Sequence, residues 1–73
     1  LQAGSFKNKQ DAEQMRAEII LLGLDARIEP RTSKKGTVWN RVIVGPFTSR
    51  SKLQQARSTL IDNNVPTMVF KHD

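Results

Sequence analysis

Trp39 and Arg41 are the residues whose types and spacing best suit chemistry on a ligand. They lie two positions apart in the stretch Val38 to Phe47, VWNRVIVGPF. Side chains alternate between the faces of a strand, so Trp39, Arg41 and Ile43 share one face. The other face carries Val38, Asn40, Val42 and Val44. An aromatic ring beside a fixed cation can stack on a ligand and also donate hydrogen bonds to it. The alternative is a second covered core face, or a Trp at a contact between copies.

Catalysis is not expected. The sequence has no Cys, its one His is His72 beside the C-terminus, and no Ser stands in a nucleophile-elbow pattern. Asp25 and Glu29 share a strand face but lie about 13 Å apart along it, an arrangement typical of solvated surface. Neither GxxxxGK nor GxGxxG is present, so no phosphate loop is indicated. We therefore expect a binding domain, not an enzyme, with no metal and no cofactor.

Length and charge limit the class of protein. The chain has 73 residues, and we expect one domain over residues 1–73. Its net charge is +5, from 12 Lys and Arg against 7 Asp and Glu, which favours an anionic partner or simply a basic surface. Lys34 and Lys35 are assigned no specific role. No membrane span or signal peptide is present, and because the chain begins at Leu1 without Met we expect an excised domain.

Two amphipathic helices are predicted, because apolar residues recur every three or four positions. The first covers residues 9–22, with Asn8 as its N-cap and Gly23 as its left-handed end. The second begins after Ser49 and ends at Asn63 and Asn64. The expected buried stripes are Ala12, Met15, Ile19 and Leu22 in the first helix and Leu53, Ala56 and Leu60 in the second, with Ile61 as a further candidate.

Four short strands are predicted from alternating or β-branched segments. They cover residues 1–3, 24–29, 38–44 and 65–70. Gly4-Ser5 is expected to break the first strand, Pro30 to end the second and Gly45-Pro46 to end the third. A polar loop over residues 30–37 joins the second and third strands as a hairpin. Pro66, near the start of the last strand, favours an edge position for it.

The sequence repeats itself with an offset of 41 residues, so that Gly4 falls on Gly45 and Phe6 on Phe47. Each half reads strand, helix, strand, with a Gly-x-Phe turn before the helix. Right-handed crossovers that interleave the halves predict an α+β fold, βαββαβ, with a four-stranded antiparallel sheet and two helices on one face. The other sheet face then remains open.

This open face is expected to combine an apolar floor with one aromatic ring, one amide and one guanidinium. Alternation places these residues on it: Gln2, Trp39, Arg41, Ile43 and Met68, with Ser5 at the rim. We expect Trp39, Arg41 and Ile43 to be exposed to solvent or to a ligand. Such groups suit stacking on a sugar and bonding its hydroxyl, acetamide or carboxylate groups. Binding of single-stranded RNA or DNA is the alternative, and docking of another protein is a third interpretation.

The strings LQAGSF and WNRVIVGPF, with helices closing at Leu22-Gly23 and Leu60, resemble the SPOR (sporulation-related repeat) domain family over essentially the whole chain. WNRV-x-x-GP is most similar to the SPOR domain at the C-terminal, periplasmic end of a cell-division protein. The resemblance implies an RNP-like fold that binds peptidoglycan glycan strands lacking stem peptides. It further implies a place at the division septum, on a parent protein held in the inner membrane by a segment outside this sequence. Other division proteins are then possible partners of the parent, and the domain itself is expected to contact neither nucleic acid nor membrane.

The family's groove residues carry over where its motifs coincide with this sequence. Its Q-x-G-S-F and W-N-R-V motifs match Gln2, Ser5, Trp39 and Arg41. An apolar contact on the last strand falls on Val69 by register from the helix end, or on Met68 by alternation. The resemblance also implies that Arg41 pairs with the lactyl carboxylate of muramic acid, which a denuded strand exposes. Some relatives join the first and last strands by a Cys pair, which this chain lacks.

Overall fold

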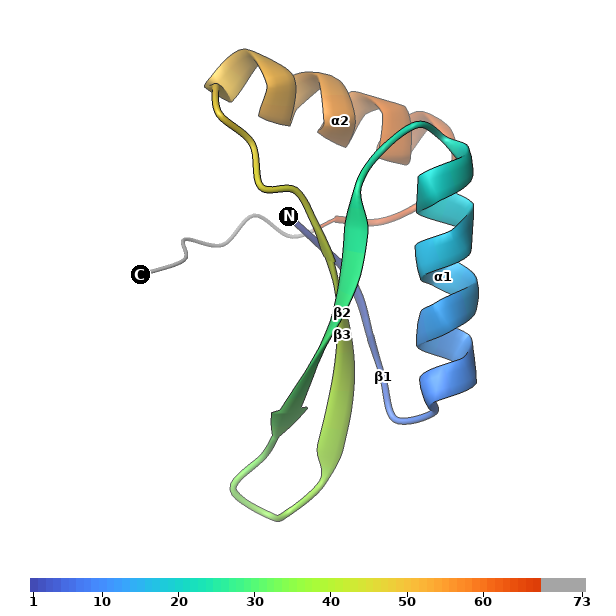
Figure 1. Cartoon of the computed structure of the whole chain (residues 1–73), viewed down its shortest axis with the longest axis vertical. Coiled ribbons are helices and arrows are strands. Elements are labelled where there is room, and N and C mark those ends of the chain that lie inside the picture. Colours follow the sequence, from blue (N-terminus) through green and yellow to red (C-terminus); the bar gives the residue numbers. More distant parts are fainter. Residues whose placement is uncertain (68–73) are drawn as a thin grey trace.

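The fold is a three-stranded antiparallel sheet with two helices, seen in a computed structural model that describes residues 1–67 (Figure 1). Along the chain its elements are β1 (Gln2–Phe6), α1 (Lys9–Leu21), β2 (Ala26–Thr32), β3 (Val38–Val44) and α2 (Arg50–Asp62). The strand order is β1-β3-β2, so β3 is central. In Figure 1, α1 runs alongside the sheet, α2 lies near its upper end, and the β2–β3 hairpin projects below both helices.

The predicted four-stranded sheet is confirmed for three strands. Residues 65–67, the start of the predicted fourth strand, form no strand. Its remainder, with the candidate groove residues Met68 and Val69, lies outside the described residues. The α+β class and the antiparallel pairing are as expected.

Both helices begin and end where the sequence predicts, within a residue. The Asn8 side chain accepts a hydrogen bond from the Gln10 N–H at 2.8 Å, and Ser49 Oγ accepts one from the Lys52 N–H at 3.2 Å. These caps satisfy backbone donors that a first helical turn leaves unpaired. Ile61 is 54% exposed, so its candidate place in the buried stripe is wrong. It lies one position beyond Leu60, which already points into the core.

The ends of the helices reproduce the sequence repeat in backbone geometry. After α1, the N–H groups of Gly23 and Leu24 donate to the carbonyls of Ile20 and Ile19, at 2.9 and 3.3 Å. After α2, the N–H groups of Asn64 and Val65 donate to the carbonyls of Ile61 and Leu60, at 3.0 and 2.8 Å. Gly23 and Asn64 have positive φ, 87° and 62°. Both helices therefore close with the same Schellman motif, 41 residues apart.

The sequence predicts a break in the first strand at Gly4-Ser5. The strand instead continues to Phe6. A β-bulge lets it do so, because the register changes between Gln2, opposite Ile43, and Gly4, opposite Val42. Gly4 therefore lies inside a strand, not in a turn. A Cβ on Gly4 would lie 2.7 Å from the Phe6 ring, and one on Gly45 would lie 3.1 Å from the Phe47 ring. The Gly-x-Phe repeat thus places a ring against each glycine.

Strand β2 begins at Ala26, two residues later than predicted, and runs further than predicted, through Pro30 to Thr32. Pro30 pairs in register with Asn40 of β3, and β2 is an edge strand of the described sheet. Edge strands tolerate proline, because the missing N–H then faces no neighbouring strand. The extra residues place Arg31 opposite Trp39, which the prediction did not anticipate.

The core lies between one face of the sheet and the helices. Its largest fully buried side chains are Ile19 of α1, Leu60 of α2, and Val42 and Val44 of β3. Side chains alternate along β3, so the valines lie on the face opposite Trp39. Both helices contribute to this one cluster, as the repeat predicts.

Asn40 interrupts the apolar inner face of β3 and holds the connection from β1 to α1. It is 9% exposed, and its Nδ2 donates to the carbonyls of Phe6 and Lys7, at 3.2 and 3.3 Å. These carbonyls lie just before α1, where the chain leaves the sheet. The buried amide therefore supplies hydrogen bonds that the strand no longer supplies.

Candidate functional site

The candidate site is built from rows of side chains that cross the sheet on the face opposite the core. Pairing aligns Gln2, Ile43 and Arg27 in one row. The next row contains Ser5, Arg41 and Glu29. A last pair, Trp39 and Arg31, lies beyond the end of β1, because that strand stops at Phe6 opposite Asn40. The hairpin thus carries the aromatic ring past the edge of the first strand.

The β-bulge decides which β1 side chains reach this face. Gln2 and Ser5 are three positions apart, and a regular strand would point them to opposite faces. The extra residue at the bulge restores them to the same face, opposite Ile43 and Arg41 respectively. Gly4, beside the bulge, is the sequence signal that could have indicated it, because glycine inside a strand often marks a bulge.

Gln2 and Arg41 are joined directly. Arg41 Nε donates to Gln2 Oε1 at 2.9 Å, and Arg41 Nη2 donates to the same oxygen. Both residues are partly buried, so this charge-assisted contact restricts the guanidinium to one orientation above the sheet. Gln2 and Arg41, both predicted site residues, therefore form one hydrogen-bonded pair.

Trp39 is partly buried and carries a cation over its ring. Lys7 Nζ lies 5.3 Å from the ring centroid, a cation–π distance. Lys7 was not among the predicted site residues. It lies beyond the end of β1, which is why strand alternation could not place it on this face.

A shallow depression of about 490 Å³ collects three of the predicted residues. It is lined by Ser5, Arg31, Thr32, Ser33, Trp39 and Arg41. The indole thus shares the depression with two arginines and with three hydroxyl-bearing residues. The depression is open to solvent. This is expected, because a domain of this length has too little buried volume to enclose a deep site.

Ile43 departs from the prediction. It is 4% exposed, although alternation placed it correctly on the open face. On this central strand it lies between Gln2 and Arg27, and long side chains on both neighbouring strands can cover a residue between them. Ile43 therefore supports the floor of the face and is not an exposed contact.

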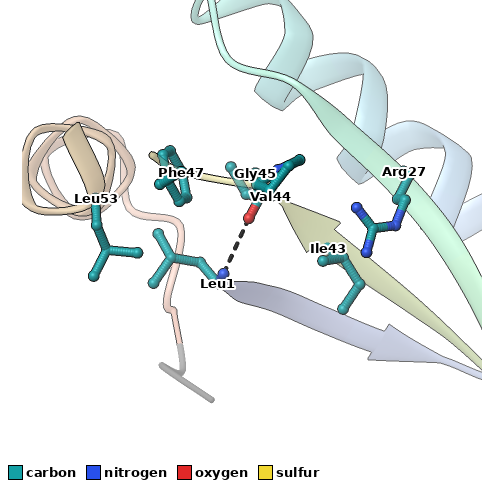
Figure 2. A pocket seen from close by; sticks show the side chains of 8 residues that line it. Leu1, Arg27, Ile43, Val44, Gly45, Phe47 and Leu53 are labelled. Atoms are coloured by element: carbon teal, nitrogen blue, oxygen red, sulfur yellow. Dashed lines mark hydrogen bonds between the residues drawn. The ribbon is translucent and has the colours of Figure 1, made fainter. Parts of the chain in front are cut away.

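Ile43 instead borders a second pocket, of about 370 Å³, at the other end of the sheet (Figure 2). Leu1, Phe47 and Leu53 contribute apolar side chains, and Arg27 lies on its sheet side. The Leu1 amino group donates to the Val44 carbonyl at 3.0 Å.

The charges on the site face come mostly from residues that the sequence prediction left out. Arg27 Nη2 forms a 2.7 Å salt bridge with Glu29, which lies in the Arg41 row. The sequence predicts Glu29, with Asp25, only as solvated surface and assigns Arg27 no role. With Lys7, Arg31 and Arg41, the face has four cations and one carboxylate among the residues named in these rows and contacts.

Over residues 1–67, no group of three His, Cys, Asp or Glu side chains could hold a metal ion. Neither α1 nor α2, the described helices, is long and apolar enough to cross a membrane.

The chain matches the model of one protein family. A family model described as SPOR domain matches residues 1–69. The crystal structure of the RlpA SPOR domain from Pseudomonas aeruginosa has a TM-score of 0.83, covering 96% of this chain and 95% of that one, at 23% identity. An uncharacterized protein of Haemophilus influenzae is 38% identical over 58 residues, which are 80% of this chain. The aligned region spans about a quarter of that relative's length, 26%.

Proposed function

This chain belongs to the SPOR domain family, a family of peptidoglycan-binding domains, and on that premise we propose that it binds glycan strands lacking stem peptides. The binding is non-catalytic and uses the open face of the sheet. A denuded strand presents sugar rings with hydroxyl, acetamide and carboxylate groups, and no bulky peptides obstruct a shallow depression. Ser5, Trp39 and Arg41 contact the sugars directly, and Gln2 orients Arg41.

The single observation that carries this proposal is the partly exposed Trp39 ring beside Arg41 and Ser5 in one depression. The apolar face of a sugar stacks on an indole, while guanidinium and hydroxyl groups bond its polar edge. The restrained Arg41 lowers the entropy lost on binding, because its orientation is already set by Gln2.

The test is cosedimentation of the domain with peptidoglycan sacculi treated with an amidase, which removes the stem peptides. Trp39→Ala should lower the bound fraction at least tenfold, since the stacking surface is lost, and leave the circular dichroism spectrum unchanged. Leu21→Ala is the matched control, because Leu21 is an apolar residue of α1 that is 86% exposed. Undiminished sedimentation of the Trp39 variant would contradict the proposal.

The place of action that we propose is the division septum, in the periplasm, where amidases produce denuded strands. An exported fluorescent fusion of residues 1–73 should gather at septa, and the same fusion with Trp39→Ala should remain diffuse. The chain covers only 26% of the Haemophilus influenzae relative. We therefore also propose, and do not infer from that relative, that the parent protein has a membrane anchor and contacts further division proteins. A uniform distribution of the unchanged fusion would exclude septal targeting by this domain.

Single-stranded nucleic acid is the second candidate ligand, favoured by the cations that surround Trp39. Lys7 lies over the ring and Arg31 pairs with it across the strands. A binder of this kind stacks bases on aromatic rings and loses affinity steeply with salt. Salt-sensitive binding of an oligonucleotide, with no affinity for denuded sacculi, would favour it over the glycan.

A further inference from the structure

The three arginines on the site face are in different states. Arg27 donates from Nε and Nη2 to Glu29 Oε2, at 2.9 and 2.7 Å. Arg41 donates from Nε and Nη2 to Gln2. Within residues 1–67, the Arg31 guanidinium has no hydrogen bond or salt bridge, and the residue is exposed. Arg31 is thus the arginine of this face that is positioned beside the depression without a protein partner in the described chain.

Arg31 lies beside other groups that suit the binding of an anion. Arg31 pairs with Trp39 across β2 and β3, and both line the depression. Thr32 and Ser33 line it as well. Ser33 Oγ accepts from the Thr37 N–H at 3.2 Å, which leaves the Ser33 hydroxyl hydrogen available to a ligand. Lys7 does not line the depression.

We propose that Arg31, with the hydroxyls of Thr32 and Ser33, binds the carboxylate of the sugar that stacks on Trp39. This inference rests on the proposed function and adds the residue that selects acidic sugars. A guanidinium presents two parallel N–H groups that match a carboxylate. Arg41 already uses two of its N–H groups on Gln2, so Arg31 is the better carboxylate partner and Arg41 bonds neutral polar groups. The site therefore prefers muramic acid with a free lactyl carboxylate over the same sugar with that group neutralised.

The experiment measures the affinity of the domain for two soluble ligands. One is a denuded tetrasaccharide of alternating N-acetylglucosamine and N-acetylmuramic acid, and the other is the same compound with its carboxylates converted to methylamides. Trp39 is the only Trp, so its fluorescence reports binding at the site. The unchanged domain should bind the acid about fivefold more tightly than the amide, in keeping with the modest strength of exposed ion pairs.

Single substitutions test which residue causes the preference for the acid over the amide. Arg31→Gln should bind the acid about fivefold more weakly and bind the amide as the unchanged domain does, so that the preference disappears. Arg31→Lys should retain part of it. Arg50→Gln, at an exposed position at the start of α2, is the matched control and should keep the full preference.

Several outcomes would overturn the inference. If Arg31→Gln keeps the preference while Arg41→Gln loses it, the carboxylate belongs to Arg41. If the unchanged domain binds acid and amide equally, no carboxylate is recognised, although the proposed glycan binding stands. If the unchanged domain binds neither ligand, or if Trp39→Ala cosediments normally with denuded sacculi, the proposed function itself is wrong, and the Arg31 subsite with it.

Discussion

At the scale of single residues, the site depends on contacts between side chains that are far apart in sequence. Gln2 and Arg41 lie on different strands, and their two hydrogen bonds form only after β1 has paired with β3. The sequence motifs indicated both residues as ligand contacts. The structure adds that the Gln2 amide oxygen accepts from the Arg41 guanidinium, so in the proposed site Gln2 positions Arg41.

The contact predicts a measurable effect of removing the Gln2 amide. Gln2→Ala should lower the affinity for denuded glycan about threefold to tenfold, because Arg41 loses the acceptor that orients it. The free energy of unfolding should fall by about 1 kcal/mol, the usual contribution of one hydrogen bond. A binding isotherm and a urea titration measure the two effects.

Gln14→Ala is the control for Gln2→Ala, because Gln14 is an exposed amide on α1. It should change neither quantity. Unchanged glycan affinity in the Gln2 variant would mean that Arg41 needs no support from Gln2.

At the scale of elements, the duplicated strand–helix–strand unit explains why both helices close with the same hydrogen bonds. The two copies use different residues at the position of positive φ, Gly23 after α1 and Asn64 after α2. Glycine has no Cβ to strain this conformation, whereas asparagine tolerates it at some cost. The repeat therefore contains an internal comparison of the two residues in one motif.

Exchanging these residues should shift stability in opposite directions. Asn64→Gly should raise the free energy of unfolding by about 0.5–1 kcal/mol, and Gly23→Asn should lower it by a similar amount. Denaturant unfolding followed by circular dichroism measures both. Space does not interfere at Gly23, since a Cβ there would meet nothing within 4 Å.

Asn63→Gly controls for the general effect of a glycine at the end of α2. Asn63 has φ −103°, and its Nδ2 donates to the Thr59 carbonyl at 2.8 Å. This variant should lose stability, because glycine gains nothing at negative φ and the hydrogen bond disappears. If Asn64→Gly also loses stability, the Asn64 side chain has a role beyond its backbone conformation.

At the scale of the whole molecule, local signals predicted more than pairing signals did. Helix caps, helix ends and the buried stripes of the helices depend on a few neighbouring residues, so the sequence predicts them well. The repeat predicts that both helices pack on the same face of the sheet. The bulge beside Gly4, the passage of β2 through Pro30 and the burial of Ile43 all depend on what lies across the sheet. No periodicity within one strand contains that information. The same reason explains why Trp39 and Arg41 were predicted while their neighbours Lys7 and Arg31 were not.

The distribution of charge gives a prediction for the molecule as a whole. The net charge is +5, and Glu29 is the carboxylate within the rows of the site face. Glu29→Gln and Glu18→Gln each raise the net charge by one. Glu18 is exposed on α1, on the helix side of the sheet. If the local field of the face attracts the acidic strand, only the Glu29 variant should associate faster, by about twofold to threefold at low salt.

Stopped-flow fluorescence of Trp39 with the denuded tetrasaccharide measures this rate. In 1 M salt the Debye length falls to about 3 Å, and the Glu29 and Glu18 variants should then associate at the same rate. Equal acceleration by both variants at low salt would mean that net charge, and not the arrangement of Arg27, Arg31 and Arg41 on the site face, attracts the ligand. A slower Glu29 variant would show instead that the Arg27–Glu29 salt bridge shapes the binding face.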